Sequence, residues 1–302
     1  MIFGIDVGND TTKNDSMVKF RSRVIAGHKG VNKDDIKVEY KGKKYTIGSK
    51  AGSLNLGPNK YFNVDYDVCL LTAIAKSGIE QNIDAEIVVG LPPEQYESPI
   101  NDKLGKKINA LGRQEITIYE GDKKIKKIIT ITKGMVFEES AIVFNNPKQF
   151  KEEKTLIIDI GGGSCDIAQF DGLELVNHNT TKLGMLTLYT DMKTALNSEF
   201  GNIGLQSEAM EDILGKDTYE INEEVKDVAF LKDVVEAHVR EINNVVAQNF
   251  DPGNRKIRVI GGGAEPLLDY IKKYYSNAKV LDNAQFLNAL TYKEVGLAVW
   301  GE

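Results

Sequence analysis

The chain carries the same short pattern twice, about half its length apart. Residues 2–13 read IFGIDVGNDTTK, and residues 155–166 read TLIIDIGGGSCD. A shift of 153 positions superimposes Asp6 on Asp159 (159 − 6 = 153). An internal repeat of this kind predicts two related structural units rather than one large core, and 302 residues are enough for two medium-sized domains.

Each copy has the composition of a buried strand that ends in a tight hairpin. A short apolar run precedes the aspartate, and the same shift superimposes Gly8 on Gly161 and Thr11 on Ser164. Glycine permits the sharp reversal of the chain. The turn therefore exposes backbone N–H groups and hydroxyls, which together form a nest of donors for phosphate. Two such hairpins facing each other would hold a polyphosphate from both sides.

Strands and helices alternate in the rest of the chain, which predicts an α/β fold. Beyond the repeat, strands are expected within 37–48, 86–91, 116–132 and 257–261. Helices are expected over 67–77, 101–111, 138–146, 185–199, 206–214, 223–249, 265–275 and a C-terminal segment at 292–302.

The composition excludes several classes of function. No apolar run approaches the roughly 20 residues that span a membrane, and the N-terminal residues do not have the pattern of a secretory signal. The two cysteines and three histidines show no metal-ligand spacing. A cytoplasmic location is expected. The net charge of −6 argues against direct nucleic-acid binding, which requires a cationic surface.

Four segments together resemble the superfamily of actin, sugar kinases and chaperone ATPases. They are GIDVGNDTTK, MVFEESAIVF, LIIDIGGGSCDIAQF and VIGGGAEPLL. Their order is that of the superfamily's first phosphate loop, first connecting helix, second phosphate loop and adenosine loop. Among these actin-like ATPases the chain is most similar to the ParM/StbA/AlfA group of plasmid-segregation actins, through segments such as EIVVGLPPEQY.

The resemblance implies a fold and a domain organisation. The fold is α/β and actin-like (ribonuclease H-like), with two domains of mixed five-stranded sheets flanked by helices and the nucleotide in the interdomain cleft. Domain I is expected over 1–150, with an inserted small subdomain over about 19–65. Domain II is expected over 151–302, with a helical subdomain over about 185–252 and the C-terminal helix.

The resemblance also implies which residues bind nucleotide. Those expected to bind ATP or GTP are Gly8, Asn9, Thr11, Thr12, Lys13, Gly161, Gly162, Gly163, Ser164, Gly261, Gly262, Gly263, Ala264 and Glu265. The helix containing Glu208 is expected to form the other wall of the purine pocket.

Asp6 and Asp159 are expected to serve catalysis by holding Mg²⁺ through water. One or two carboxylates, water and phosphate oxygens are the usual ligands of this ion in proteins. The alternative role for each aspartate is to cap its own turn. The recurrence of the two residues at matching positions favours the metal role.

Lys13 and Asp166 distinguish the two hairpins. Lys13 follows Asp6 by seven positions (13 − 6 = 7), and Asp166 holds the equivalent place after Asp159 (166 − 159 = 7). The resemblance implies that the Lys13 ammonium contacts phosphate oxygens, with an ordinary surface lysine as the alternative.

Glu139 is the candidate for the hydrolytic step. The resemblance places a polar residue that orients the attacking water at the start of the helix expected over 138–146. Phosphoryl transfer depends mostly on positioning and electrostatics, so a single carboxylate can suffice. Glu138 is an alternative for this role, and stabilisation of a helix N-terminus is the alternative role for Glu139.

These inferences combine into a filament-forming ATPase that hydrolyses ATP, or GTP, as copies of the chain assemble head to tail. The resemblance further implies a small DNA-binding adaptor, through which the filament drives plasmid segregation. No association with a membrane is expected. A small-molecule kinase of the same fold, similar to pantothenate or sugar kinases, is one alternative, and a nucleotide-binding regulator without catalysis is another.

Overall fold

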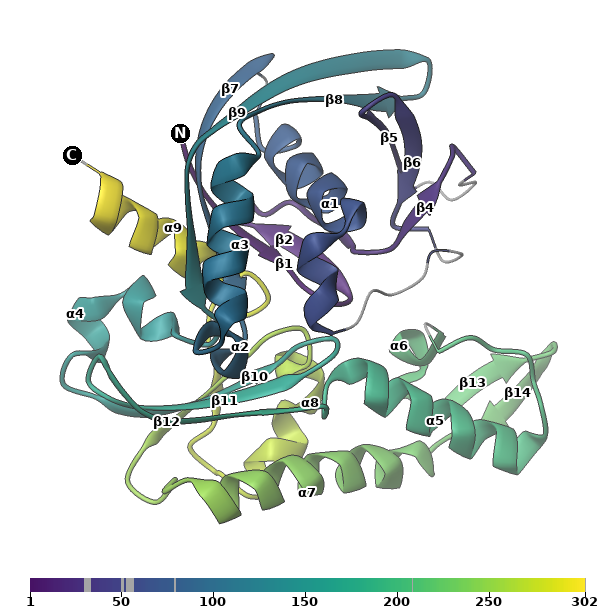
Figure 1. The fold of residues 1–302 in the computed structure, drawn as a ribbon. Coiled ribbons are helices and arrows are strands. Elements are labelled where there is room, and N and C mark those ends of the chain that lie inside the picture. Colours follow the sequence, from purple (N-terminus) through teal and green to yellow (C-terminus); the bar gives the residue numbers. More distant parts are fainter. Residues whose placement is uncertain (30–33, 50–51, 53–56, 79, 208, 302) are drawn as a thin grey trace. The chain divides into compact units, whose positions relative to one another are not determined.

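The computed structural model describes residues 1–29, 34–49, 52, 57–78, 80–207 and 209–301. The chain divides into two compact units, of which the first comprises Met1–Gln149 and Phe286–Glu302 and the second Phe150–Gln285. The assignment of the C-terminal helix to domain II was therefore wrong. This helix, α9, spans Leu287–Trp300 and packs on the first strands of the chain (Figure 1).

The first unit is built on a sheet of nine strands. They are β1 (Ile2–Val7), β2 (Thr11–Asn14), β3 (Lys19–Arg21), β4 (Val24–Ala26), β5 (Ile36–Tyr40), β6 (Lys43–Ile47), β7 (Asn82–Leu91), β8 (Arg113–Glu120) and β9 (Lys123–Glu138), in the order β3-β2-β1-β7-β9-β8-β5-β6-β4. The predicted sheet of five strands is too small for this unit. The small subdomain's hairpin β5–β6 pairs with β8, so it extends the same sheet instead of standing apart.

Helices cover both faces of the first sheet. Besides α9 they are η1 (Pro58–Phe62), α1 (Val64–Ala75), α2 (Pro93–Tyr96), α3 (Pro99–Ala110) and η2 (Ile142–Asn145), with α4 (Pro147–Phe150) at the boundary of the units. Phe3 and Ile5 of β1 lie in one hydrophobic cluster with Leu71 of α1. Gly4, between them, lies against the backbone of α9. Because side chains alternate along a strand, α1 and α9 lie on opposite faces.

Local sequence signals explain where two of these helices begin. The Asn63 side chain accepts a hydrogen bond of 2.9 Å from the Tyr66 N–H and so caps α1. Ser98 caps α3 in the same way through the Ile100 N–H at 3.2 Å, and Pro99 occupies the first helical position, where no N–H is needed.

The second unit repeats the core of the first. Its strands are β10 (Lys154–Ile160), β11 (Cys165–Asp171), β12 (Glu174–Thr181), β15 (Lys256–Ile260) and β16 (Lys279–Val280), in the order β12-β11-β10-β15-β16, with a separate hairpin β13 (Thr218–Ile221)–β14 (Glu224–Asp227). Its helices are α5 (Met185–Phe200), α6 (Ala209–Ile213), α7 (Leu231–Asn249) and α8 (Ala264–Lys272). The predicted five-stranded sheet is confirmed here.

The strand registers confirm the repeat seen in the sequence. Asp6 lies directly opposite Lys13 in the antiparallel pair β1–β2, and Asp159 lies directly opposite Asp166 in β10–β11. The central strand of each unit has the same neighbours. β1 pairs antiparallel with β2 and parallel with β7, and β10 pairs antiparallel with β11 and parallel with β15.

The prediction of one helix over 223–249 was wrong at its start. Residues Thr218–Asp227 form the hairpin β13–β14, and α7 begins only at Leu231. The hairpin turns at Asn222 and Glu223, whose φ angles are 52° and 65°. Two successive residues with positive φ are the geometry of a two-residue hairpin turn that follows the twist of the strands.

Candidate functional site

The first hairpin places an acid and a base side by side at the end of β1. Lys13 Nζ lies 4.0 Å from Asp6 Oδ2, and their side chains are only 11% and 12% exposed. This pair is therefore largely shielded from water, which strengthens electrostatic interactions with any further charged group. Lys13 is not the freely solvated surface lysine that was considered as an alternative.

The turn of the first hairpin contains two unsatisfied polar atoms. Asn9 Oδ1 and Asp10 Oδ1 are buried and make no hydrogen bond within the described part of the chain. Thr11 donates its hydroxyl to Asp10 Oδ2 at 3.0 Å, and Arg21 also pairs with this carboxylate. Thr12 is fully buried with its hydroxyl 2.9 Å from Ser22 Oγ, so its side chain holds the sheet together. Either hydroxyl can donate in this contact, so it is the full burial of the Thr12 side chain that argues against the expected role as a phosphate donor.

Lys60 is a residue of this site that sequence reasoning missed. It lies in η1, is 8% exposed, and donates from Nζ to the Val7 carbonyl at 3.3 Å. Together with Gly8, Asn9 and neighbouring residues it lines a cavity of about 20 Å³, which is room for about one water molecule. No local motif marks Lys60, because it reaches the loop from 53 residues away in the sequence.

The segment carrying Glu139 is a turn and not the start of a helix. Glu138 ends β9, and the following helix η2 begins only at Ile142, so the predicted helix over 138–146 was wrong. The Glu139 N–H donates to the Leu91 carbonyl at 2.8 Å. The alternative role for Glu139, stabilising a helix N-terminus, therefore loses its basis.

Tyr66 shows that Asp6 and Glu139 lie in one neighbourhood. Burial raises the pKa of the Tyr66 phenol above its usual range, and the carboxylates of Asp67, Asp6 and Glu139 raise it further. The first unit thus brings the predicted metal-binding carboxylate and the predicted water-orienting carboxylate close to the same side chain.

The second hairpin contains a braced carboxylate where the first has its lysine. Asp166 is 2% exposed and accepts hydrogen bonds from the hydroxyls of Ser164, at 2.8 Å, and Thr180, at 2.6 Å. Asp159, opposite it, is 5% exposed. The Ser164 hydroxyl, predicted to face phosphate, is directed at Asp166 instead.

The turn of the second hairpin packs against the start of α5. The N–H groups of Met185 and Leu186 donate to the carbonyls of Gly161 and Gly162 at 3.0 and 2.9 Å. The Gly161 N–H itself donates to the Ser164 carbonyl at 2.9 Å. The backbone of this loop is therefore fixed from both sides.

The predicted adenosine loop lies directly beside the second hairpin. Gly263 donates to the Ile160 carbonyl at 2.9 Å, and Gly261 donates to the Ala284 carbonyl at 3.0 Å. Gly261 has φ of 86°, and a Cβ at this position would collide with Ile160 O and approach Asp159 Oδ1. Only glycine fits this close approach. The second unit thus brings together Asp159, the predicted phosphate loop and the predicted adenosine loop.

The remaining predicted residues lie at the start of α8. Ala264 is buried at the first helical position, and Glu265 is exposed in the first turn. Gly262 is also exposed. Glu208 lies outside the described residues.

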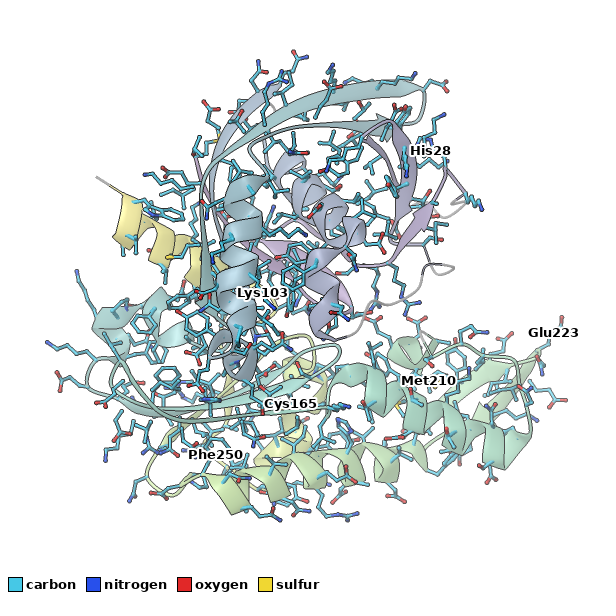
Figure 2. The ribbon with its side chains drawn as sticks, viewed as in Figure 1. His28, Lys103, Cys165, Met210, Glu223 and Phe250 are labelled. Carbon is cyan, nitrogen blue, oxygen red and sulfur yellow. The ribbon has the colours of Figure 1, made fainter. Side chains whose placement is uncertain are left out.

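Cys165 opens β11 beside the phosphate loop (Figure 2). It is fully buried, and burial raises the pKa of its thiol well above the usual range, as do the nearby carboxylates of Asp166 and Asp159. A thiol held in this protonated state is a packing residue and not a nucleophile.

Comparisons with known proteins identify the fold. Residues 4–141 match the family profile described as "Actin like proteins N terminal domain". The first half of the chain therefore resembles the N-terminal domain of actin-like proteins. Among curated proteins none matches the sequence.

Several solved structures share the actin-like fold along the whole chain. The archaeal actin homologue Ta0583 in complex with ADP gives a TM-score of 0.82 at 16% identity, covering 99% of each chain. A 15-stranded ParM filament from Clostridium botulinum gives 0.77 at 21% identity, covering 98% of this chain and 99% of that one. The Alp12 filament gives 0.70 at 20%, covering 99% and 98%. The predicted two-domain actin-like fold is confirmed.

The carboxylates of Asp6 and Asp159 fit the chemistry of Mg²⁺ bound mainly through water. The described residues contain no cluster of three His, Cys, Asp or Glu side chains. Asp6 and Asp159 each lie near the end of a central strand in their own unit. Mg²⁺ needs only one or two protein carboxylates when phosphate oxygens and water complete its shell.

A search of the described helices for membrane spans finds none that is both long and apolar enough to cross a bilayer.

Proposed function

We propose that this actin-like chain is an ATPase that binds ATP or GTP with Mg²⁺, hydrolyses it, and assembles into filaments with copies of itself. The observation that carries this proposal is the duplicated hairpin, in which Asp6 and Asp159 hold the same register position at the ends of equivalent strands. The family of the first unit and the ADP complex of Ta0583 support nucleotide binding.

The two hairpins would bind the phosphates in different ways. In the first, the Lys13 ammonium provides a point charge for phosphate oxygens, and the Asn9 side-chain NH2 group in the adjacent turn would donate to them. In the second, the glycines of the loop leave backbone N–H groups as the donors. Asp6 and Asp159 would hold Mg²⁺ through water, and the ion would neutralise charge on the phosphates. The residues from Gly261 to Glu265 would contact the adenosine.

Glu139 would orient the attacking water. Phosphoryl transfer requires a positioned water and compensation of charge more than covalent help from the protein. The Glu139 carboxylate can accept a hydrogen bond from that water, and the hydrogen bond from its own N–H to Leu91 fixes the backbone that carries it.

Filament formation and DNA segregation complete the proposal. The Alp12 and Clostridium botulinum ParM structures are filaments, and head-to-tail contacts that do not close into a ring generate such polymers. We further propose that a small DNA-binding adaptor links the filament to plasmid DNA, because a chain with net charge −6 is poorly suited to bind DNA directly.

The test combines light scattering with phosphate release, for protein given Mg-ATP, Mg-GTP or no nucleotide. Wild-type protein should scatter light and release phosphate after nucleotide addition, and chelation of Mg²⁺ should abolish both. Glu139→Gln should slow phosphate release by about 100-fold while assembly persists. Glu138→Gln is the matched control and should retain activity. Phosphate transfer that requires an added small acceptor, without scattering, would support the kinase alternative.

A further inference from the structure

Helix α9 packs on the C-terminal ends of β7 and β9, and Glu139 directly follows β9. In the parallel pair β7–β9, Gly90 lies opposite Phe137 and Leu91 lies opposite Glu138. Tyr292 of α9 is fully buried, with its ring centroid 6.4 Å from that of Phe137. Its hydroxyl fills the space where a side chain at Gly90 would begin. One helix therefore packs on both strand ends.

The turn after β9 has an unusual conformation that a side chain of α9 supports. Ser140 is fully buried and has φ of 65°, which is a sparsely populated region for a residue with a Cβ. Its N–H donates to Asn288 Oδ1 at 3.1 Å. Residues in such regions persist only where the surrounding structure holds them, and a buried N–H without a partner is costly.

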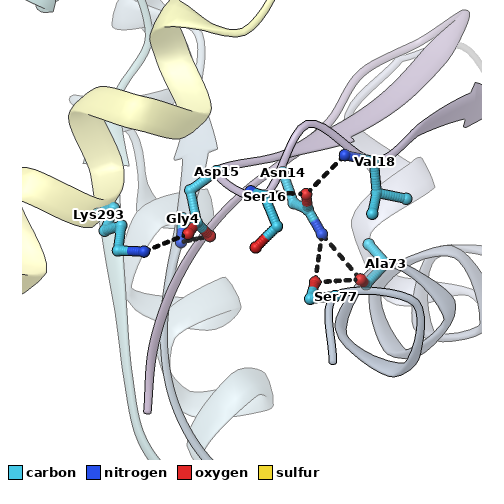
Figure 3. A network of polar contacts seen from close by, with 8 residues as sticks. All are labelled: Gly4, Asn14, Asp15, Ser16, Val18, Ala73, Ser77 and Lys293. Carbon is cyan, nitrogen blue, oxygen red and sulfur yellow. Dashed lines mark hydrogen bonds and ion pairs between the residues drawn. The ribbon is translucent and has the colours of Figure 1, made fainter. Parts of the chain in front are cut away.

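The helix that carries Asn288 is itself anchored to the first strands. Lys293 Nζ lies 2.6 Å from Asp15 Oδ2, and Asp15 Oδ1 accepts a hydrogen bond of 3.0 Å from the Gly4 N–H (Figure 3). The Asp15 side chain is only 1% exposed. Asn288 therefore projects from a helix whose position in the first unit is fixed.

We propose that Asn288 is a positioning residue for hydrolysis. Its amide oxygen fixes the Ser140 backbone and so fixes the direction in which the adjacent Glu139 side chain leaves the turn. The inference rests on the proposed hydrolytic role of Glu139 and adds a residue that makes no contact with the nucleotide. Since a displacement of about 1 Å in a catalytic group can cost roughly 100-fold in rate, losing this hydrogen bond should slow hydrolysis without weakening nucleotide binding.

The first experiment compares Asn288→Leu, which has no acceptor, with Asn288→Asp, which keeps one. Asn288→Leu should lower kcat for phosphate release by about ten-fold or more, with KM and the affinity for a fluorescent ATP analogue unchanged. Asn288→Asp should restore most of kcat. Lys293→Met is the control for general loosening of α9, and it should lower the unfolding midpoint but lower kcat much less than Asn288→Leu does, because buried Tyr292 still holds the helix against Phe137 and Gly90. Equal losses of kcat in Asn288→Leu and Lys293→Met, or no restoration by aspartate, would overturn the inference.

A second measurement does not depend on activity. Hydrogen exchange of the Ser140 amide should be faster in Asn288→Leu than in wild-type protein, and normal in Asn288→Asp. If wild-type protein releases no phosphate, the proposed function fails, and the exchange data still report whether Asn288 holds the turn. Unchanged protection of Ser140, or normal hydrolysis by Asn288→Leu in an active protein, would refute the role of Asn288 alone.

Discussion

The two units of this protein use one hairpin in two different ways. Both place an aspartate at the end of the central strand, and the residue opposite is Lys13 in the first unit and Asp166 in the second. Lys13 has a nearby carboxylate but keeps its ammonium available for further charge-assisted contacts, whereas Asp166 uses its two carboxylate oxygens to hold the hydroxyls of Ser164 and Thr180. The same position thus supplies a positive charge in the first hairpin and holds two hydroxyl groups in place in the second.

The units also differ at the end of the next strand. Val89 pairs with Ile5 in the first unit, and Val259 pairs with Ile158 in the second. Two residues further on, the equivalent positions are Leu91 and Gly261 (91 − 89 = 2; 261 − 259 = 2). The Leu91 carbonyl accepts the Glu139 N–H, while Gly261 lets the chain come close to Asp159. The two units therefore use this matched position differently: in the first it supports the backbone of the proposed hydrolytic residue, and in the second it belongs to the proposed adenosine loop.

The largest effect is expected from a substitution at Gly261, whose counterpart in the first unit is Leu91. Gly261→Ala adds a Cβ at φ of 86° and against the Ile160 carbonyl, so the free energy of unfolding should fall by about 3 kcal/mol. Nucleotide affinity should fall with it. Gly262→Ala is the matched control for the stability measurement, since nothing lies within 4 Å of a Cβ there. Urea unfolding and binding of a fluorescent nucleotide would measure both effects, and equal midpoints for the two variants would contradict the expectation.

A pair of substitutions sharpens the contrast between Lys13 and Asp166. Lys13→Met should weaken nucleotide binding by about ten- to one-hundred-fold, the loss expected for a charge-assisted contact, and should also lower stability because the shielded Asp6 carboxylate loses its ion-pair partner. Asp166→Ala should lower the free energy of unfolding by about 1–3 kcal/mol, because two hydroxyls lose their acceptor, but should leave nucleotide affinity less affected than Lys13→Met does. Titration with labelled nucleotide and urea unfolding test this. Unchanged affinity in Lys13→Met would remove Lys13 from the phosphate site.

The smallest expected effect is a pH dependence specific to the second unit. His238 of α7 is 4% exposed, and its Nε2 lies 3.2 Å from the carbonyl of Leu183, just before α5. Burial lowers the pKa of His238 below its usual 6.5, although the hydrogen bond to Leu183 and the charges of Asp191 and Glu241 act in the opposite direction.

The sign of this pH effect follows from linkage. As pH falls below 6.5, His238 takes up a proton in the unfolded chain before it does so in the folded chain. The stabilising contribution of neutral, buried His238 is therefore fully present above pH 6.5 and is lost as pH falls through the folded-state pKa. His238→Gln should lose less stability than wild-type protein between pH 7.5 and 5.5, as measured by urea midpoints. Identical pH dependence in both proteins would show that other groups dominate.

The sequence predicted the elements whose signals are local. The apolar run, aspartate and glycine of each copy predicted two strand-ending hairpins, and the structure confirms both. The helices expected from residues 67 and 101 begin a few residues earlier, after the capping residues Asn63 and Ser98. The hairpin at Asn222–Glu223 was missed because glutamate seldom adopts positive φ, so its acidic sequence looked helical. Lys60, Ser140 and Asn288 could not be predicted, since their roles depend on contacts between segments far apart in the chain.

The return of α9 to the first unit has a consequence for synthesis. The ribosome releases the second unit, Phe150–Gln285, before it makes the helix that completes the first. Although domains usually fold in N-to-C order, here the first unit cannot be completed until α9 has been made after the second unit. Until α9 emerges, the face of β1 and β7 that it covers is open to other hydrophobic surfaces. Translation pauses before Phe286 should therefore favour aggregation, and rapid completion of the last residues should protect the nascent protein.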